Sequence, residues 1–207
     1  MNKKNTNNKK KTKNNNEKNT KSEKNKQTTI KYTDEQQKYI QYVGKTNDRF
    51  NNTKLLACAG SGKTGCIIAK MCFLVKNNYV TKDGVLMLTF SRFTRDDFIN
   101  KISNNDEAKQ YINTDTNIKT IDSFAKKVID TGNQIDVSLL SYRLMLLLEE
   151  SEPSELLKNQ FFKKTRIIFV DEAQDLNEIQ YRIFCAMNDK LGICLLYTSD
   201  AADDIRR

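Results

Sequence analysis

Two short segments of the sequence hold the residue types that bind phosphate groups and magnesium. Residues 57–64 read ACAGSGKT, and residues 167–175 read IIFVDEAQD. Small residues in the first segment allow several backbone N–H groups to point at one anion, and the lysine adds a positive charge. Carboxylates in the second segment suit Mg²⁺, and one of them can orient an attacking water molecule. Together the two segments predict a nucleoside triphosphate site.

The first segment has the flanks of a phosphate-binding loop. An apolar strand candidate, TKLLAC, precedes it, and the run GCIIAKMCFLV predicts a helix whose N-terminal dipole favours the same anion. We expect Lys63 to contact the terminal phosphates and Thr64 to offer its hydroxyl to Mg²⁺. Ala57 stands where the usual pattern begins with glycine, and its small side chain makes it a tolerated variant. The predicted phosphate-loop residues are Ala57, Cys58, Ala59, Gly60, Ser61, Gly62, Lys63 and Thr64.

The second segment predicts a buried strand that ends in two carboxylates. Four apolar residues run from Ile167 to Val170, and Asp171 and Glu172 follow at the edge where open α/β sheets bind ligands. We expect Asp171 to hold Mg²⁺, mostly through water, and Glu172 to orient and deprotonate the hydrolytic water. Alternatively, the two acids only stabilise the N-terminus of the next helix. The phosphate-loop pattern in the same chain favours the catalytic interpretation.

The elements that position these segments follow from hydrophobic periodicity and turn residues. Strands are expected at residues 53–58, 84–90, 117–120 and 166–171, and again from Leu191. Helices are expected at residues 34–46, 63–76, 93–103, 122–131 and 175–189, with one or two more between 138 and 163. This alternation predicts an α/β fold of the P-loop NTPase type, in which helices cover both faces of a parallel sheet.

The order of the motifs resembles that of superfamily 1 helicases of the UvrD/Rep type. DEAQD is similar to the Walker B box of that group, and the segments YTDEQQKYI, VLMLTFSRFTRDDF and TIDSFA match further motifs in order. The resemblance covers residues 32–193 and implies a RecA-like domain that uses ATP and Mg²⁺. It also implies a helicase that couples ATP hydrolysis to translocation on single-stranded DNA, with this chain as a fragment of its N-terminal motor domain.

The same resemblance assigns further residues. YTDEQQKYI looks like the motif that reads adenine, which places Gln36 at the base. VLMLTFSRFTRDDF looks like motif Ia, and TIDSFA resembles the motif that follows it. The residues implied to contact DNA are Phe90, Ser91, Arg92, Ser123 and Phe124. Asp122 stands where relatives usually have histidine, and the chain contains no histidine, so the contact that histidine makes in relatives is not carried over.

The implied DNA contacts have a physical basis and an alternative. Aromatic side chains stack on bases at roughly 1–3 kcal/mol each, and neighbouring basic groups hold the phosphates. Phe90 with Arg92 and Arg95 fits this pattern. Alternatively, Phe90 ends a buried strand as a core residue, and Phe124 belongs to an ordinary amphipathic helix with Ser123 near its first turn.

Charge and composition separate a tail from a folded body. Residues 1–29 contain ten Lys and two Glu, whereas the remainder carries 25 basic and 24 acidic residues. We expect residues 1–31 to be a disordered basic tail that tethers nucleic acid or acts as a nuclear signal, unless an AT-rich genome explains its Lys and Asn content. Neither a signal peptide nor a membrane span is evident, which predicts a cytoplasmic or nuclear protein without a membrane partner. The five cysteines show no metal-binding spacing.

The last residues depart from the family pattern. Relatives have a Gly-Asp-x-x-Gln motif after the last strand, whereas this chain reads YTSDAADDIRR. The ending resembles translated sequencing-adapter read-through, so we expect residues 194–207 to lie outside the family domain; the alternative is a divergent C-terminus. Helicases of this type close their ATP site with arginines from a second RecA-like domain, which we expect to be missing here. The competing hypothesis is a single-domain nucleotide-binding module that binds nucleic acid without unwinding it.

Overall fold

The structure is a computed structural model that describes residues 31–46, 49–58, 60–129 and 136–200, without the side chain of Asp200. Contacts divide the chain into Met1–Lys31 and Tyr32–Arg207, and the fold described below is that of the second unit. The predicted basic tail lies outside the described residues except for Lys31.

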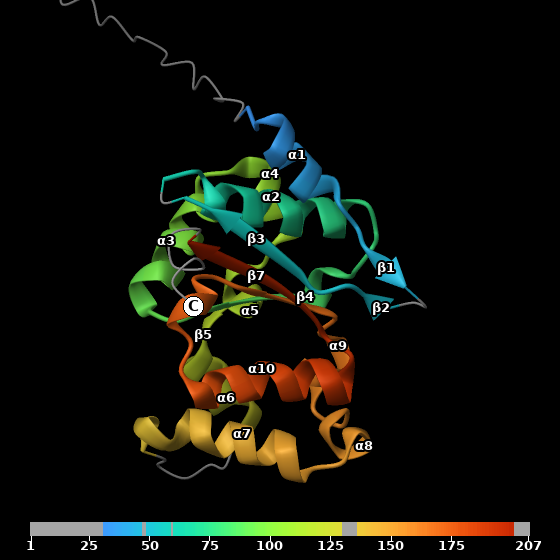
Figure 1. Ribbon diagram of the computed structural model, residues 1–207, viewed down its shortest axis with the longest axis vertical. Coiled ribbons are helices and arrows are strands. Elements are labelled where there is room, and N and C mark those ends of the chain that lie inside the picture. Colours follow the sequence, from blue (N-terminus) through green and yellow to red (C-terminus); the bar gives the residue numbers. More distant parts are fainter. Residues whose placement is uncertain (1–30, 47–48, 59, 130–135, 201–207) are drawn as a thin grey trace, which may run out of the picture. The chain divides into compact units, whose positions relative to one another are not determined.

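A five-stranded parallel sheet forms the centre of this unit (Figure 1). Its spatial order is β3-β7-β6-β4-β5. The strands are β3 (Thr53–Ala57), β4 (Val85–Thr89), β5 (Ile118–Thr120), β6 (Ile167–Val170) and β7 (Cys194–Asp200). β7 comes last among these strands in the chain but lies between β3 and β6, so it separates the two strands that precede the predicted site residues. All the strands run in the same direction, and their carboxyl ends therefore meet at one edge of the sheet.

Helices cover both faces of the sheet, as predicted (Figure 1). One face carries α2 (Lys63–Lys76), α3 (Arg92–Ser103) and α4 (Asp106–Tyr111), and α1 (Asp34–Gln41) packs against α2. The other face carries α6 (Ile121–Ile129), α7 (Leu140–Glu150), α8 (Pro153–Leu156), α9 (Gln160–Lys164) and α10 (Glu178–Leu191). The remaining elements are α5 (Thr114–Asn117), the hairpin β1 (Lys45–Thr46) and β2 (Arg49–Phe50), and the 3-10 helices η1 (Lys82–Gly84), η2 (Val137–Leu139) and η3 (Ala173–Asp175).

The structure differs from the predicted elements mainly at helix ends. The first helix ends at Gln41 rather than at residue 46, because the chain turns there towards the β1–β2 hairpin. The last helix begins at Glu178 rather than at residue 175, because Asn177 and Gln180 form a capping box that starts it there. Asparagine caps also start the unpredicted helices α4 and α5. The region 138–163 contains three α-helices instead of one or two.

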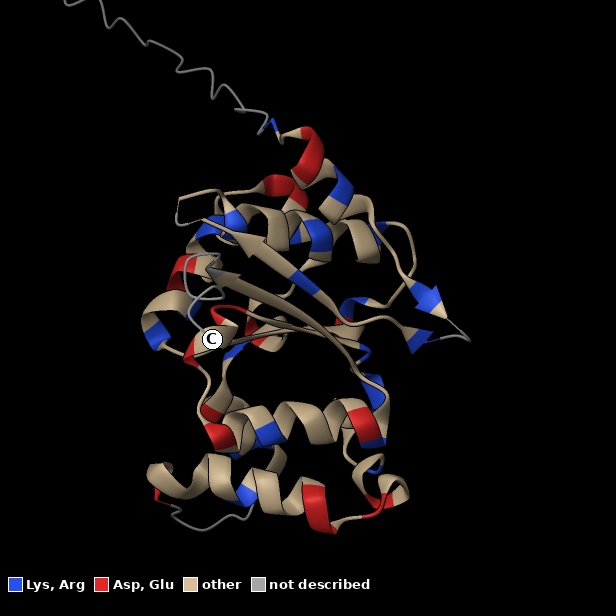
Figure 2. Cartoon of the chain, viewed as in Figure 1, with Lys and Arg blue, Asp and Glu red and all other residues tan. Residues whose placement is uncertain are grey.

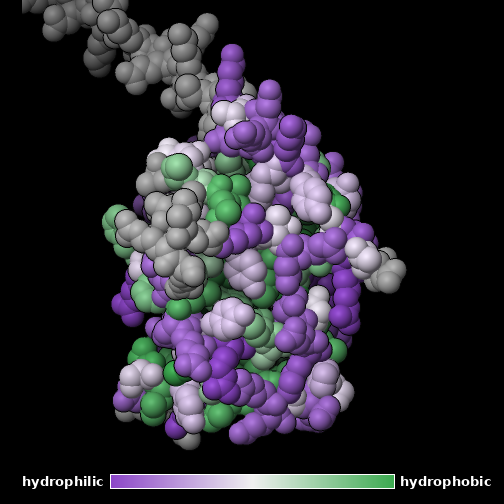
Figure 3. Space-filling view, viewed as in Figure 1, coloured by the Kyte–Doolittle hydropathy of each residue, from purple (hydrophilic) through white to green (hydrophobic). Residues whose placement is uncertain are grey.

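Basic and acidic residues are spread over most of the helices and loops rather than gathered by sign (Figure 2). This mixture agrees with the near balance of acidic and basic residues outside the tail. On the face shown in Figure 3, hydrophilic side chains predominate and apolar side chains appear between them. In the part of the chain that the structure describes, no helix has both the length and the apolar character needed to cross a bilayer.

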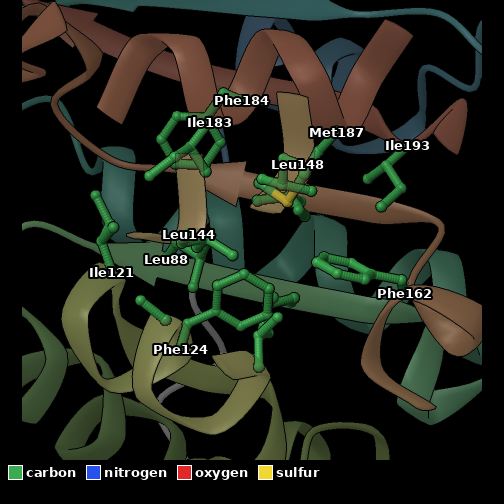
Figure 4. Close-up of a cluster of buried hydrophobic side chains, with 14 of the residues drawn as sticks. Leu88, Ile121, Phe124, Leu144, Leu148, Phe162, Ile183, Phe184, Met187 and Ile193 are labelled. Carbon is green, nitrogen blue, oxygen red and sulfur yellow. The ribbon is translucent and has the colours of Figure 1, made fainter. Parts of the chain in front are cut away.

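Two apolar layers hold the helices on the sheet. Every residue of β4 and β6 is buried, as expected for central strands of a parallel sheet with both faces covered. Below the sheet in Figure 1, α6, α7 and α10 contribute a shared cluster with β4 and β6. Figure 4 shows side chains of this cluster pointing into one interior, among them Leu88, Phe124, Leu144 and Phe184. Packing on both faces fixes β6, and with it the position of Asp171 and Glu172.

Candidate nucleotide-binding site

The phosphate-loop candidate connects β3 to α2 at the carboxyl edge of the sheet. Gly60 and Gly62 have φ values of 76° and 83°, in the left-handed region that glycine adopts without steric cost. Gly62 is the N-cap of α2, so the loop passes directly into the N-terminus of a 14-residue helix. The backbone N–H groups and the positive dipole of a helix N-terminus together favour an anion. Ala59 lies outside the described residues.

The lysine of the loop contacts the second carboxylate of the acidic segment. Lys63 Nζ lies 3.0 Å from Glu172 Oε1 and 3.4 Å from Oε2. The lysine side chain is only 10% exposed, so this ion pair is shielded from solvent on one side. Gln174 Nε2 donates a second hydrogen bond to Glu172 Oε2 at 2.8 Å. Residues more than a hundred positions apart are therefore brought to one point, between the phosphate loop and the end of β6.

Glu172 has an unusual backbone conformation. Its φ of 49° and ψ of 54° lie in the left-handed region, which is uncommon for a residue other than glycine. Such conformations cost about 1–3 kcal/mol and cluster at functional sites. The chain turns at Glu172 from β6 into η3, and its carboxylate lies against Lys63. The sequence predicted the position of Glu172 at a strand end but not this turn.

Asp171 is held by a residue from β7. Its carboxylate is buried, and Oδ1 accepts a hydrogen bond from Thr198 Oγ1 at 2.6 Å. The same hydroxyl accepts the backbone N–H of Glu172 at 3.3 Å. Burial raises the pKa of the Asp171 carboxyl above its ordinary value, and the hydrogen bond from Thr198 opposes that rise.

Thr198 and Gln174 bond to the two carboxylates but were not among the predicted site residues. Thr198 lies within residues 194–207, the segment predicted to depart from the family. The structure places residues 194–200 in β7, between β3 and β6, where a strand was expected from Leu191 onward. Gln174 is part of DEAQD itself, and its proximity to Glu172 in sequence was the available signal. For Thr198 the signal was its position at the end of an apolar run, where the other strands carry their polar site residues.

The two residues predicted to hold magnesium would supply a hydroxyl and a carboxylate. Thr64 lies in the first turn of α2, and Asp171 lies at the end of β6. No group of three His, Cys, Asp or Glu side chains suited to a metal occurs among the described residues. The two oxygen donors fit a hard cation that takes the rest of its coordination shell from phosphate and water.

Gln36 lies beside the phosphate loop. Its Nε2 donates to the carbonyl oxygen of Ser61 at 2.9 Å, and its Oε1 accepts the backbone N–H of Thr33 at 2.8 Å. The hydroxyl of Tyr32 also reaches the carbonyl of Gly65 at 3.4 Å. Gln36, the residue predicted to read adenine, therefore lies next to the predicted phosphate site. Both the nitrogen and the oxygen of its side-chain amide form hydrogen bonds within the protein.

The candidate DNA contacts after β4 face solvent. Phe90 is 54% exposed, so it is not the core residue of the alternative interpretation. Arg92 is also exposed, whereas Ser91 caps α3 by accepting the N–H of Thr94 at 3.0 Å. The neighbouring Phe93 is 85% exposed and was not among the residues predicted to contact DNA. Exposed aromatic rings such as these offer flat faces on which nucleic-acid bases can stack.

Phe124 does not face solvent, and its predicted contact with DNA is wrong. The side chain is 1% exposed and packs edge to face on Phe161 and Phe162, with ring centroids 6.1 and 6.2 Å away. A base cannot reach this ring without unfolding the cluster below the sheet. Ser123 is half-buried, and its backbone N–H donates to Thr120 Oγ1. Asp122, in the histidine position, accepts a hydrogen bond from Ser141 of α7 at 3.1 Å.

Replacement of Phe124 by alanine is expected to reduce stability. Removal of a buried aromatic ring from a packed core costs about 3–5 kcal/mol. Urea unfolding followed by circular dichroism measures the loss. Phe93→Ala is the matched control, because removal of an exposed ring changes stability by no more than about 0.5 kcal/mol. Equal stability of Phe124→Ala and the parent chain would contradict the burial seen here.

A glycine loop that opens a helix and acidic residues at the end of a nearby parallel strand together define a RecA-like P-loop NTPase domain. The family described as UvrD/REP helicase N-terminal domain matches residues 34–134 and 128–196, and the chain belongs to this family. The matched residues include the phosphate loop, Asp171 and Glu172, and they extend three residues past the predicted domain boundary at 193.

A relative from Acanthamoeba polyphaga mimivirus, provisionally named an ATP-dependent DNA helicase, is 33% identical over 178 residues. The similarity covers 84% of this chain and 25% of that protein. The chain therefore spans about a quarter of the length of the relative that it matches.

Proposed function

We propose that this chain is the first ATP-binding domain of a DNA helicase, which binds ATP with Mg²⁺ and hydrolyses it during translocation on single-stranded DNA. The observation that carries the proposal is the contact of 3.0 Å between Lys63 and Glu172. This contact joins a phosphate-binding group to a potential base for water. A domain that only binds nucleotide has little use for a carboxylate in that place.

The residues of the site have separate tasks in this proposal. Lys63 and the backbone of Gly60 to Thr64 bind the phosphates, while Thr64 and Asp171 hold the magnesium ion. A bound Mg²⁺ would supply positive charge to the β- and γ-phosphate oxygens, where negative charge develops in the reaction. Phosphate oxygens compete with Glu172 for Lys63, so nucleotide binding frees the carboxylate. Glu172 then orients the water that attacks the γ-phosphate and accepts its proton.

Nucleic acid and a second domain complete the proposal. Exposed Phe90 stacks on a base, and Arg92 holds a phosphate at the end of β4. Gln36, next to the loop, reads the adenine base after its amide leaves the protein groups that it contacts here. A second RecA-like domain in the complete helicase supplies arginines to the γ-phosphate, which can raise phosphoryl-transfer rates by orders of magnitude.

Replacement of Phe90 by alanine tests the proposed DNA contact. Loss of one stacked base costs about 1–3 kcal/mol, which corresponds to a fall in affinity of roughly 5- to 150-fold. Fluorescence anisotropy of a labelled oligothymidylate at physiological salt measures this affinity. Tyr181→Ala is the matched control, because Tyr181 is an exposed aromatic residue of α10 on the other face of the sheet. Equal affinities of Phe90→Ala and the parent chain would argue against base stacking at this edge.

A further inference from the structure

The helix that carries Gln36 depends on α2 for its position. α1 has only eight residues, and isolated helices of that length are marginal in water. Its buried residues Tyr39 and Ile40 pack against Cys66 of α2. α2 begins at Lys63, so the same helix holds both the phosphate-binding lysine and the surface on which α1 rests. The orientation of α1 therefore determines where Gln36 lies relative to the phosphates.

A buried lysine of α2 binds the C-terminal end of α1. Lys70 is 2% exposed, and its Nζ donates to the carbonyl oxygens of Tyr39 at 2.6 Å and Tyr42 at 2.7 Å. The ammonium group also lies 4.6 Å from the ring centroid of Tyr39 and 5.9 Å from that of Tyr42. The last carbonyls of a helix lack partners within the helix and carry its negative dipole, so a cation is favoured there. A buried charge is tolerated only with such partners.

Gln36 anchors the other end of α1 to the phosphate loop through the carbonyl of Ser61. We propose that Lys70 is a positioning residue for the nucleotide base: by holding the C-terminal end of α1 on α2, it keeps Gln36 beside the phosphate loop. The proposal rests on the proposed function, in which Gln36 reads adenine. Lys70 itself touches neither nucleotide nor magnesium, and it acts through α1.

The charge state of Lys70 is compatible with this task. Burial lowers the pKa of Lys70 to about 8, so most molecules carry the ammonium form at neutral pH. The titratable groups around it are Tyr39 and Tyr42 at the end of α1, and Cys194 of β7. Burial raises the pKa of the Cys194 thiol to about 12, so that thiol is neutral and does not compete for the ammonium group.

Binding of two ligands to the 207-residue chain tests the proposal. Calorimetry with Mg·ATP reports contacts to phosphates and base, whereas Mg·tripolyphosphate reports contacts to phosphates alone. Lys70→Met keeps the apolar stem but removes the donor and its charge. We expect it to weaken ATP binding about tenfold, the scale of a hydrogen bond from a charged group, and to leave tripolyphosphate binding within about twofold.

Two further variants make the measurement specific. Lys76→Met is the matched control, because Lys76 lies exposed in the last turn of the same helix and pairs with Glu107 on the surface. It should bind both ligands as the parent chain does. In a Gln36→Ala background, Lys70→Met should cause no further loss of ATP affinity, because the contact that Lys70 positions has already been removed. Circular dichroism checks folding, and Lys70→Gln, a neutral donor, replaces Lys70→Met if the latter does not fold.

The outcomes separate the inference from the proposed function. A selective loss of ATP affinity that disappears in the Gln36→Ala background supports a positioning role. An equal loss for both ligands would show that Lys70 only maintains the fold, and unchanged ATP affinity would show that α1 needs no such anchor; either result overturns the inference. Binding of neither ligand by the parent chain would overturn the proposed nucleotide site itself, and the role of Lys70 with it.

Discussion

Lys63→Ala is expected to abolish ATP hydrolysis by the complete helicase in the presence of single-stranded DNA. The lysine is the one side-chain cation placed by the sequence at the phosphate loop, and the structure directs it to the end of β6. Loss of one group that stabilises charge in a transition state costs about 10²–10³ in rate. ATP affinity also falls, because the same charge binds the phosphates before reaction. Release of inorganic phosphate and calorimetric titration with Mg·ATP measure the two effects.

The control for Lys63→Ala is Lys158→Ala. Lys158 is an exposed lysine that pairs with Glu155 on the surface, and such pairs contribute little. Removal of the same charge there should leave hydrolysis unchanged. Retained hydrolysis in Lys63→Ala would refute the assigned role. In that case the contact between Lys63 and Glu172 would be an ordinary ion pair between the start of α2 and the end of β6.

Glu172→Gln is expected to separate ATP binding from ATP hydrolysis. The amide keeps the size of the side chain but cannot accept a proton from water, so the rate falls by about 10²–10⁴. Binding is retained, because the change removes a negative charge near the phosphates and keeps Lys63, which binds them. Single-turnover hydrolysis and calorimetry on the same preparation distinguish the two steps. Normal turnover by Glu172→Gln would exclude this carboxylate as the base.

Glu178→Gln provides the matched control for Glu172→Gln. Glu178 lies exposed in the first turn of α10, six residues further along the chain. This position tests the alternative raised by the sequence, in which the acids of this region only stabilise a helix N-terminus. A loss of activity in Glu178→Gln equal to that in Glu172→Gln would favour that alternative. A large loss in Glu172→Gln alone would favour catalysis.

Local signals were sufficient for much of the fold. The range 63–76 was predicted for the loop helix and is the range of α2, because a glycine turn precedes it and the polar residues Lys76 to Asn78 end its largely apolar run. The strands β4 and β6 lie within the predicted ranges, since runs of apolar residues bounded by polar ones are typical of buried parallel strands. The confirmed α/β class and the family assignment rest on the same signals.

Burial of individual aromatic residues was not decided by local signals. Phe90 and Phe124 both lie within a few residues of the end of a strand, and both were assigned to DNA. The structure leaves Phe90 exposed and buries Phe124 against α9. The difference arises because α6 turns Phe124 towards helices that are more than thirty residues away in sequence. Such packing depends on contacts between distant segments, which the hydrophobic periodicity of the sequence does not reveal.

By itself, the sequence determined the class of site, because the glycine loop, Lys63 and the carboxylates after β6 are contiguous patterns with known chemistry. Only the tertiary structure decided how these parts meet. It placed β7 between β3 and β6, brought Thr198 to Asp171 and Gln174 to Glu172, and buried Lys70 beneath α1. Strand order and side-chain pairing between distant segments follow from the packing of the whole domain, which minimises exposed apolar surface and pairs buried polar groups.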